Sequence, residues 1–336
     1  MRIAIIGAGA VGSILAARLV KSGEDVTLVG REDQVQALTG KPLTVKRSDG
    51  MEYVNVRTEV RLSAEHDVAV FATKTQDLPE AIQRNREYLE RCSLLTTQNG
   101  VRADGLLAEC FDGQRLVSTI VMFGATYTRP GEVTFNFEGC VILGRPFPLP
   151  GAARDPAMSA IAEAFARAFE VKLATDITAM KHLKLFVNFN NCIPALIGQS
   201  MQSTFADIDL CRLAVMLLTE GVNVMRGAGI AMASLPGFPE ERISALVSMP
   251  IDQAAGILSK TLRGLSQEPL YGSILQSILR GRTSEIDYIN GEVVQIAEGS
   301  GQHAPLNHKV VDLVHQVEKD GRFLRPDDVK EAFHLR

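Results

Sequence analysis

Short apolar runs alternate with longer helical periods in the first half of the chain. Residues 1–6 are apolar and rich in β-branched side chains, a pattern that predicts a buried strand. A helix is expected over residues 11–20 and a second strand over residues 25–29. Strands are also expected over residues 67–73 and 93–97, each followed by a helix. This alternation predicts an α/β unit built on a parallel sheet.

The pattern changes after residue 115. Two β-rich runs, residues 115–128 and 132–143, are separated by the turn-forming pair Pro130-Gly131, so we expect an antiparallel pair. Residues 155–170 have the period of an amphipathic helix, and residues 171–174 suit an edge strand.

Strand patterns disappear beyond residue 176, and helical periods continue to the C-terminus. Helices are expected over residues 177–193, 210–228, 239–247, 253–263 and 284–299. The sequence therefore predicts an α/β protein in which a doubly wound sheet in residues 1–175 is followed by an all-helical domain in residues 176–336.

The turn between the first strand and the first helix carries the pattern G-x-G-x-x-G. Its members are Gly7, Ala8, Gly9, Ala10, Val11 and Gly12. In such a turn the first glycine permits the bend, the second lets a pyrophosphate approach the backbone, and the third lets helix and strand pack closely. The phosphates bind the free N–H groups at the helix N-terminus. Because the motif lies within a βαβ unit, it predicts a Rossmann-type domain that binds a dinucleotide.

The residue after the second strand indicates which dinucleotide binds. NAD sites usually place a carboxylate there for the ribose 2′-OH, whereas this chain has Arg31. A guanidinium at this position suits the 2′-phosphate of NADP. The adjacent Glu32 leaves NAD open as the alternative.

Composition and charge argue against several classes of function. The 336 residues carry a net charge of −4, which gives no electrostatic footprint for nucleic acid or an anionic membrane surface. No run of 18 apolar residues is present, so no membrane span is expected. The histidines form no H-E-x-x-H motif, and no metal site is expected. The odd number of cysteines without a C-x-x-C pair favours reduced thiols in a cytoplasmic protein.

One predicted helix combines a lysine and two amides with apolar neighbours. Lys184, Asn188 and Asn191 are spaced at i, i+4 and i+7, which places them on one helix face. A desolvated lysine has a lowered pKa and suits proton donation near neutral pH. The alternative is a surface lysine that extends its ammonium group to water.

Polar residues elsewhere complete the candidate site. Lys74 and Asn99 follow predicted strands, at the sheet edge where ligands bind in open α/β folds. Ser273 and Glu285 lie in the C-terminal half, where Glu285 has a simpler interpretation as a charge that complements a helix dipole.

Taken together, these motifs resemble the ketopantoate reductase family, whose members are NADPH-dependent 2-dehydropantoate 2-reductases of pantothenate synthesis. The resemblance extends from the glycine motif to the more specific run E-I-D-Y-I-N-G at residues 285–291. It implies a Rossmann domain followed by a helical domain, NADP(H) as cofactor and a 2-keto acid as substrate.

The resemblance also implies roles for the cofactor-binding positions. Arg31 is similar to the family's contact with the 2′-phosphate, and Lys74 to its lysine that contacts the cofactor. Asn99 resembles the asparagine that touches cofactor and substrate, although Gln98 stands where the family usually has histidine.

For the substrate, the resemblance implies that Lys184 is the general acid and that Asn188 binds the substrate. Ser273 lies twelve residues before Glu285, as in the family. The implied role of Ser273 is to bind the substrate carboxylate. Glu285 would hold the substrate hydroxyl or the lysine ammonium.

Two positions depart from the family pattern. Cys192 stands where a second asparagine is usual, with Asn191 as a candidate replacement and Pro194 one place late. Ser277 stands where aspartate is more frequent. The alternatives are therefore a reductase of the same family with another 2-keto acid substrate, or a non-catalytic NADP(H) sensor. The apolar helix at residues 211–225 suits either a core or the interface of a homodimer.

Overall fold

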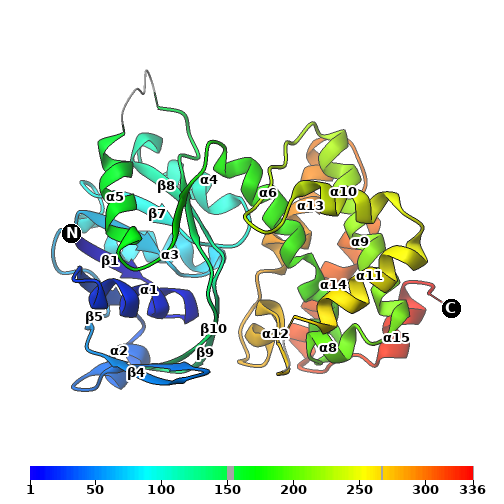
Figure 1. Cartoon of the computed structure of the whole chain (residues 1–336), viewed down its shortest axis with the longest axis horizontal. Helices are drawn as coiled ribbons and strands as arrows, with labels where there is room; N and C mark the ends of the chain where they lie inside the picture. Colours follow the sequence, from blue (N-terminus) through cyan, green and yellow to red (C-terminus); the bar gives the residue numbers. More distant parts are fainter. Residues whose placement is uncertain (150–154, 266–267, 336) are drawn as a thin grey trace. The chain divides into compact units, whose positions relative to one another are not determined.

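The computed structural model describes residues 1–149, 155–265 and 268–335 (Figure 1). The chain divides into two compact units, Met1–Thr178 and Ala179–Arg336. The first contains mixed α/β sheets and the second is helical, so the predicted fold class is confirmed. The roles predicted for residues 1–175 and 176–336, dinucleotide binding and substrate binding, stay predictions.

An eight-stranded sheet forms the centre of the first unit. Its strands are β1 (Arg2–Ile6), β2 (Asp25–Val29), β5 (Arg57–Glu59), β6 (Val68–Phe71), β7 (Ser93–Thr96), β8 (Leu116–Val121), β11 (Val141–Gly144) and β12 (Val171–Leu173). The order is β12-β11-β8-β7-β6-β1-β2-β5, with β11 antiparallel to β8 and the other pairs parallel. The chain thus runs outward in opposite directions from β1 and from β6. Crevices at such a reversal are where open α/β sheets bind ligands.

Helices cover both faces of this sheet. On one face, α1 (Ala10–Lys21) and α5 (Pro156–Ala166) share a hydrophobic core with β1. On the other, α3 (Leu78–Asn85) and α4 (Arg102–Ala108) pack against the alternate side chains of the same strands. Burial on both faces explains why the strands are continuous apolar runs instead of alternating ones.

A second sheet, with the order β4-β3-β10-β9, was not expected from the sequence. It consists of β3 (Leu43–Arg47), β4 (Gly50–Val54), β9 (Gly124–Arg129) and β10 (Glu132–Phe137). Helix α1 contacts strands of both sheets. The turn at Pro130-Gly131 does join an antiparallel pair, β9 and β10, as predicted. The two single runs expected over residues 115–128 and 132–143 were wrong, because each divides between the sheets. The first divides into β8 and β9, and the second into β10 and β11.

Short elements complete the first unit. They are α2 (Glu32–Leu38) and the 3-10 turns η1 (Thr75–Asp77), η2 (Arg86–Tyr88) and η3 (Gly113–Arg115).

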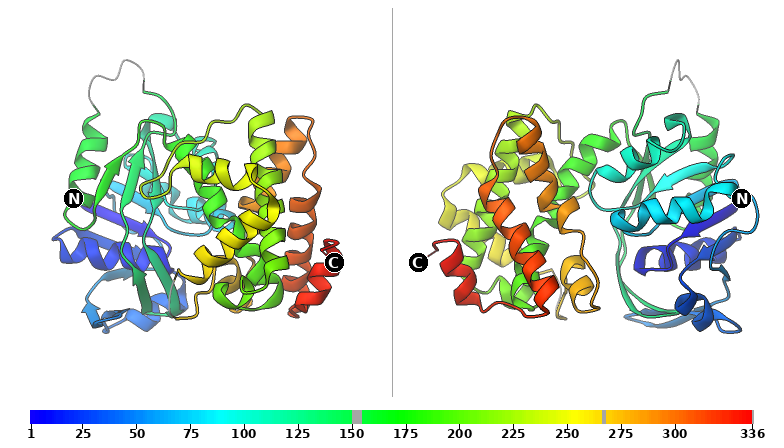
Figure 2. Two further views of the ribbon diagram at one scale, coloured as in Figure 1. Left: turned by 45° about the vertical axis from the view of Figure 1, so that its right-hand side comes forward. Right: turned by 180° about the vertical axis from the view of Figure 1, so that it is seen from behind.

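Helices of the second unit surround α9 (Ile208–Gly227), which contacts α10, α11, α13, α14 and α15 (Figure 2). In chain order the other elements are α6 (Ile177–Asn188), η4 (Phe189–Asn191), α7 (Cys192–Ile197), α8 (Met201–Thr204), α10 (Glu240–Ser248), α11 (Ile251–Arg263), α12 (Ser273–Ile278), η5 (Ile286–Tyr288), α13 (Asn290–Gly299), α14 (Pro305–Asp320) and α15 (Pro326–Ala332). The buried face of α9 lies within this one chain, so the core interpretation of residues 211–225 is confirmed. A homodimer stays a prediction.

Two expected helices differ from those in the structure. The helix over 177–193 is interrupted by the 3-10 turn η4, because Pro194 has no N–H to bond to the carbonyl four residues earlier. The helix over 284–299 begins only at Asn290, because Ile289 has the non-helical angles φ −119° and ψ −86°. Glu285 therefore lies in a turn before η5 and not in the first turn of a long helix.

All five cysteines are free thiols. In the parts of the chain that the structure describes, every helix is too short or too polar to cross a membrane.

The buried carboxylate of Asp104 connects α4 to strands β7 and β8 of the large sheet. Asp104 is only 5% exposed. It accepts hydrogen bonds from Thr96 Oγ1 of β7 at 2.5 Å and from Ser118 Oγ of β8 at 2.7 Å. Removing the carboxylate would leave two hydroxyl groups in the core without this acceptor.

We expect Asp104→Ala to lower the free energy of unfolding by about 1 to 3 kcal/mol, the usual cost of leaving buried polar groups without their partner. Urea denaturation followed by circular dichroism measures this change. Glu109→Ala, at the exposed end of the same helix, is the matched control and should change stability by less than about 0.5 kcal/mol. Equal stability of the two variants would contradict the role given to Asp104.

Candidate functional site

The carboxyl ends of β1, β6 and β7 meet at one edge of the large sheet. Gly7 follows β1 with a φ of +121°, which L side chains rarely adopt. A Cβ at Gly7 would lie 2.6 Å from the carbonyl carbon of Ala72 and from the nitrogen of Thr73. The turn after β1 therefore packs backbone to backbone against the end of β6. Lys74 follows directly, as the residue that precedes η1.

The other two glycines of the motif have opposite surroundings. A Cβ at Gly12 would collide with the carbonyl oxygen of Gly7, so α1 reaches its position only with glycine there. Around Gly9, apart from its chain neighbours, no described heavy atom lies within 4 Å of where a Cβ would be. Gly9 precedes α1, whose first N–H groups lack helical partners. This is the open space that a pyrophosphate approaching the backbone requires.

A buried glutamine, which sequence reasoning missed, connects this loop to the end of β2. Gln34 Nε2 donates to the carbonyl oxygen of Ala8 at 2.9 Å and to the Tyr127 hydroxyl at 3.2 Å. Its Oε1 accepts the Arg31 N–H at 3.0 Å. Gly30 completes the contact, because a Cβ there would lie 2.8 Å from the Ala8 Cβ. The spacing of Gln34 three residues after Arg31 is a helix-capping pattern, and that signal was available in the sequence.

Arg31 lies at the start of α2 with a half-exposed side chain. Its Nε is 3.3 Å from Asp33 Oδ1, in an exposed pair. Exposed pairs of this kind contribute little to stability, so the guanidinium remains able to turn toward a phosphate. Asp33 and Glu32 both carry negative charge beside it, and this would reduce the attraction for a 2′-phosphate.

Gln98, which replaces the family's usual histidine, ties the ends of β6 and β7 together. Its buried side chain donates from Nε2 to the carbonyl oxygens of Phe71 at 3.2 Å and Thr73 at 3.1 Å. The Thr97 hydroxyl also donates to Phe71, at 2.9 Å. Asn99 follows Gln98 and is half-buried, as Lys74 is. The structure thus brings Gly7, Lys74 and Asn99 to one edge of the sheet.

One buried polar atom at this edge has no hydrogen-bond partner among the described residues. The Oγ1 atom of Thr73 is buried and forms no hydrogen bond with the described part of the chain. Buried polar groups are normally satisfied, and an orphaned one beside a glycine turn is consistent with a ligand that supplies the partner. The open Gly9 backbone and the Thr73 hydroxyl therefore fit a bound dinucleotide.

In the helical unit, Lys184 lies on α6 between the buried residues Leu183 and Leu185 and is itself half-buried. Partial burial of this kind fits a desolvated lysine and equally one that extends its ammonium group to water, so the role of Lys184 stays a prediction. Lys181, one turn earlier, is only 3% exposed and was missed by sequence reasoning. Its spacing of three residues from Lys184 puts both amino groups on neighbouring positions of the helix.

The two asparagines lie at the end of α6 and in η4. Asn188 precedes the 3-10 turn and Asn191 is its last residue, so the tighter turn moves Asn191 off the straight face predicted for a continuous helix. The side chain of Asn191 lies against Gly272, where a Cβ would be 2.5 Å from its Oδ1. Gly272 directly precedes Ser273, the first residue of α12. Asn191 and Ser273 are therefore neighbours in space.

Cys192, the first residue that departs from the family pattern, lies in the core of the helical unit. Cys192 is wholly buried, and its Sγ donates to the Phe189 carbonyl oxygen at 3.1 Å. Burial raises the pKa of this thiol to about 12, although a hydrogen bond with Asn290 opposes the rise. Cys192 is therefore an uncharged core residue that packs beside Asn290.

Ser277, the second residue that departs from the family pattern, is hydrogen-bonded within its own helix. Ser277 is buried, and its Oγ donates to the backbone carbonyl oxygen of Ser273 at 2.9 Å. Glu285 is half-buried in the turn before η5, where its own carbonyl accepts the Tyr288 N–H at 3.0 Å. It stays a prediction that one substrate is bound by Lys184, Asn188, Ser273 and Glu285.

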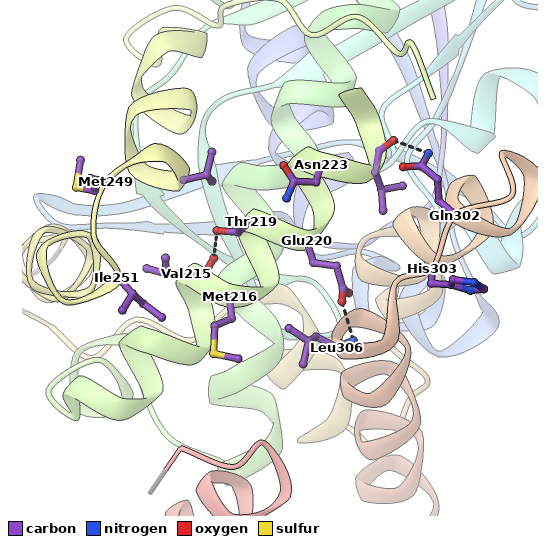
Figure 3. A pocket seen from close by; sticks show the side chains of 12 residues that line it. Val215, Met216, Thr219, Glu220, Asn223, Met249, Ile251, Gln302, His303 and Leu306 are labelled. Carbon is purple, nitrogen blue, oxygen red and sulfur yellow. Dashed lines mark hydrogen bonds between the residues drawn. The ribbon is translucent and has the colours of Figure 1, made fainter. Parts of the chain in front are cut away.

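The helical unit also has a cavity of about 750 Å³, apart from these residues (Figure 3). It is lined by Val215, Met216, Thr219, Glu220, Asn223, Val224, Val247, Met249, Ile251, Gln302, His303 and Leu306. One of its polar groups joins two helices, because Glu220 of α9 accepts the Leu306 N–H of α14. Thr219 Oγ1 donates to the Val215 carbonyl within α9. No predicted catalytic residue lines it, so size alone does not make it the active site.

A metal centre is not evident in the described residues. There, no group of three or more His, Cys, Asp or Glu side chains is placed to hold an ion.

Comparison with known proteins gives the same two-part division. A sequence model of the ketopantoate reductase PanE/ApbA family matches residues 3–146, and a model of the PanE/ApbA C-terminal domain matches residues 176–318. A 2-dehydropantoate 2-reductase from Pyrococcus horikoshii is 28% identical over 327 residues, which covers 96% of this chain and 99% of that protein.

Solved structures share the fold. The crystal structure of a PanE/ApbA family ketopantoate reductase from Ralstonia eutropha has a TM-score of 0.79 at 23% identity, with 95% of this chain and 99% of that chain covered. The structure of D-mandelate dehydrogenase with NADH and anilino(oxo)acetate has a TM-score of 0.79 at 19% identity, with the same coverage.

The glycine turn at the reversal of strand order places the first unit among dinucleotide-binding α/β proteins, here joined to a helical unit. With both domain models matched, the chain belongs to the ketopantoate reductase PanE/ApbA family, and its class is oxidoreductase.

The two glycines permit a test that separates folding from cofactor binding. Gly9→Ala fills open space at an ordinary φ of −85°, so thermal stability should be unchanged while the dissociation constant for NADPH rises by about tenfold or more. Gly12→Ala forces α1 away from Gly7 and should lower the free energy of unfolding by about 1 to 3 kcal/mol.

Thermal unfolding and isothermal titration with NADPH measure the two effects. If Gly9→Ala binds NADPH as tightly as the wild type, the pyrophosphate does not approach this backbone.

Proposed function

We propose that the protein reduces a 2-keto acid with NADPH, and that the substrate is 2-dehydropantoate (ketopantoate). The observation that carries the proposal is the match of the family's C-terminal domain over residues 176–318, the range that holds Lys184, Asn188, Ser273 and Glu285. All four side chains are half-buried in the helical unit.

The first unit supplies the cofactor site. The backbone at Gly9 and the N-terminus of α1 would hold the pyrophosphate, and Lys74 and Asn99 would contact the nicotinamide half at the ends of β6 and β7. Arg31 would hold the 2′-phosphate. Bound NADPH supplies a hydride to the carbonyl carbon of the substrate.

The helical unit supplies the proton and the substrate anchors. Lys184 donates a proton from its ammonium group to the carbonyl oxygen as negative charge develops there, and the product is the 2-hydroxy acid. The Ser273 hydroxyl and the neighbouring Asn191 amide donate hydrogen bonds to the substrate carboxylate. The Asn188 amide and the Glu285 carboxylate orient the oxygen-bearing groups of the substrate around Lys184.

Two observations bear on which 2-keto acid is used. Cys192 is buried and donates to Phe189 of η4, and Ser277 is buried and donates to Ser273 of its own helix, so both side chains have partners within the helical framework. This supports ketopantoate. The fold shared with D-mandelate dehydrogenase supports the alternative, a different 2-keto acid and a different preference between NADH and NADPH.

The proposal is tested by initial rates of NADPH and NADH oxidation with ketopantoate and with a panel of branched and aromatic 2-keto acids. The proposed activity requires the highest kcat/KM with ketopantoate and NADPH. A higher kcat/KM with another acid would assign that acid instead, and tight cofactor binding without any turnover would indicate a sensor.

In the same assay, Arg31→Gln should raise the KM for NADPH by about 10- to 100-fold, because charge-assisted hydrogen bonds to the 2′-phosphate are lost. The KM for NADH should change little, since NADH has no phosphate at that position. Equal effects on both cofactors would show that Arg31 does not read the 2′-phosphate.

Lys184→Ala should lower kcat by about 10² to 10⁴-fold, the usual effect of removing a positioned general acid, while NADPH affinity is kept. Lys260→Ala, on the exposed face of α11 in the same unit, is the matched control and should retain full activity. A kcat within about threefold of the wild type would assign Lys184 a structural role, well below the effect of a lost acid.

A further inference from the structure

One histidine of α14 bridges two carboxylates that flank the turn carrying Glu285. His315 Nε2 lies 2.9 Å from Asp287 Oδ1, and His315 Nδ1 lies 3.2 Å from Glu318 Oε2. Asp287 belongs to η5, just after Glu285, and Glu318 lies on the same helix as His315.

The second carboxylate holds the other side of that turn. Glu318 Oε1 accepts the backbone N–H of Ser284 at 2.7 Å. Ser284 directly precedes Glu285 in the chain, and Asp287 follows it by two residues. The imidazole of His315 thus connects both ends of the segment at residues 284–287, while Glu285 lies between them.

Only the charged imidazole can make both contacts as a donor. Carboxylates accept hydrogen bonds, and a neutral imidazole carries one N–H, so it donates to one carboxylate and presents a lone pair to the other. The imidazolium donates to both, and each bond is then charge-assisted. The bridge is therefore complete only when His315 is protonated.

The surrounding charges favour that state overall. Asp287 and Glu318 face His315 with two negative charges, and Arg282 and Lys319 line the adjoining cavity of about 320 Å³ with positive charge. Burial alone would lower the pKa of His315, but the hydrogen bonds and charges of Asp287 and Glu318 outweigh it, so the pKa is raised above its ordinary value of 6.5.

We propose that His315 is a positioning residue for Glu285, whose imidazolium bridges Asp287 and Glu318 and holds the turn at residues 284–287 in the shape that presents Glu285 to the substrate. This inference rests on the proposed function of Glu285. His315 itself touches neither substrate nor cofactor in this scheme.

The direction of the pH effect follows from the raised pKa. The bridge stabilises the turn fully below the ordinary pKa of 6.5, and this stabilisation is lost as the pH rises through the raised value in the folded protein. The alignment of Glu285 should therefore weaken toward alkaline pH in the wild type.

The first test is hydrogen exchange of the backbone amides at residues 284–288, measured at pH 6. His315→Gln keeps one hydrogen bond but not two, so the Ser284 amide, now less firmly held by Glu318, should exchange faster than in the wild type. His308→Gln is the matched control, because His308 pairs with Asp312 at 3.0 Å on the exposed face of the same helix. Its exchange at residues 284–288 should equal that of the wild type.

A second variant keeps the imidazole in place. Asp287→Asn removes one of the two negative charges, and the pKa of His315, followed by its NMR resonances, should fall relative to the wild type. An unchanged pKa together with unchanged exchange in His315→Gln overturns the bridge.

The kinetic test compares pH profiles. At pH 6, His315→Gln should lower kcat/KM for the 2-keto acid by roughly two- to fivefold, the size expected from a partly exposed ion pair, and the KM for NADPH should not change. The difference from the wild type should vanish above the pKa of His315. A deficit that is constant at all pH values would indicate a general structural role and overturn the positioning role.

Failure of the proposed function and failure of the role inferred for His315 give different results. Absence of turnover by the wild type with every 2-keto acid overturns the proposed function, and with it the catalytic part of this inference. The exchange and NMR results decide, without any assay of activity, whether His315 holds the turn.

Discussion

The close approach of Gly7 to the backbone after β6 is the contact on which the first unit depends. Because no Cβ separates Gly7 from Ala72 and Thr73, β1 and β6 stay paired to their ends, at the reversal of strand order. Gly12 lets α1 lie directly over the same turn, so the helix N-terminus points at the crevice. The absence of side chains at Gly7 and Gly12 thus fixes three features of the first unit. These are the pairing at the centre of the large sheet, the direction of the α1 dipole and the open space at Gly9.

The helical unit has a comparable constraint in a buried polar chain. Asn290 Nδ2 donates to Asn307 Oδ1 at 3.0 Å, and Asn307 Nδ2 donates to Glu220 Oε1 at 2.9 Å. Glu220 also accepts the N–H groups of Leu306 and Asn307, so it neutralises the N-terminus of α14. These hydrogen bonds fix α13 and α14 against α9. Helix α14 also carries His315. The run E-I-D-Y-I-N-G therefore contributes to packing through Asn290, separately from the role predicted for Glu285.

The sequence predicted the two-part fold and the glycine turn at residues 7–12, because both depend on local patterns. These patterns are apolar runs, turn residues and a fixed glycine spacing. It did not predict the second sheet, because β3 pairs with β10 across about ninety residues of chain and no local pattern in either strand indicates that pairing. Gln34 was missed although its capping position was visible in the sequence, because its bonds to Ala8 and Tyr127 join segments far apart in the chain. The burial of Lys181 was missed because a charged residue is normally exposed.

The same reasoning changes the meaning of the departures from the family pattern. From the sequence alone, Cys192 in place of an amide indicates a lost hydrogen bond in the substrate site. In the structure the 3-10 turn at η4 rotates the chain, so Cys192 enters the core and Asn191 faces Gly272, next to Ser273. The amide that lies next to Ser273 is therefore that of Asn191, whereas the side chain at position 192 is in the core.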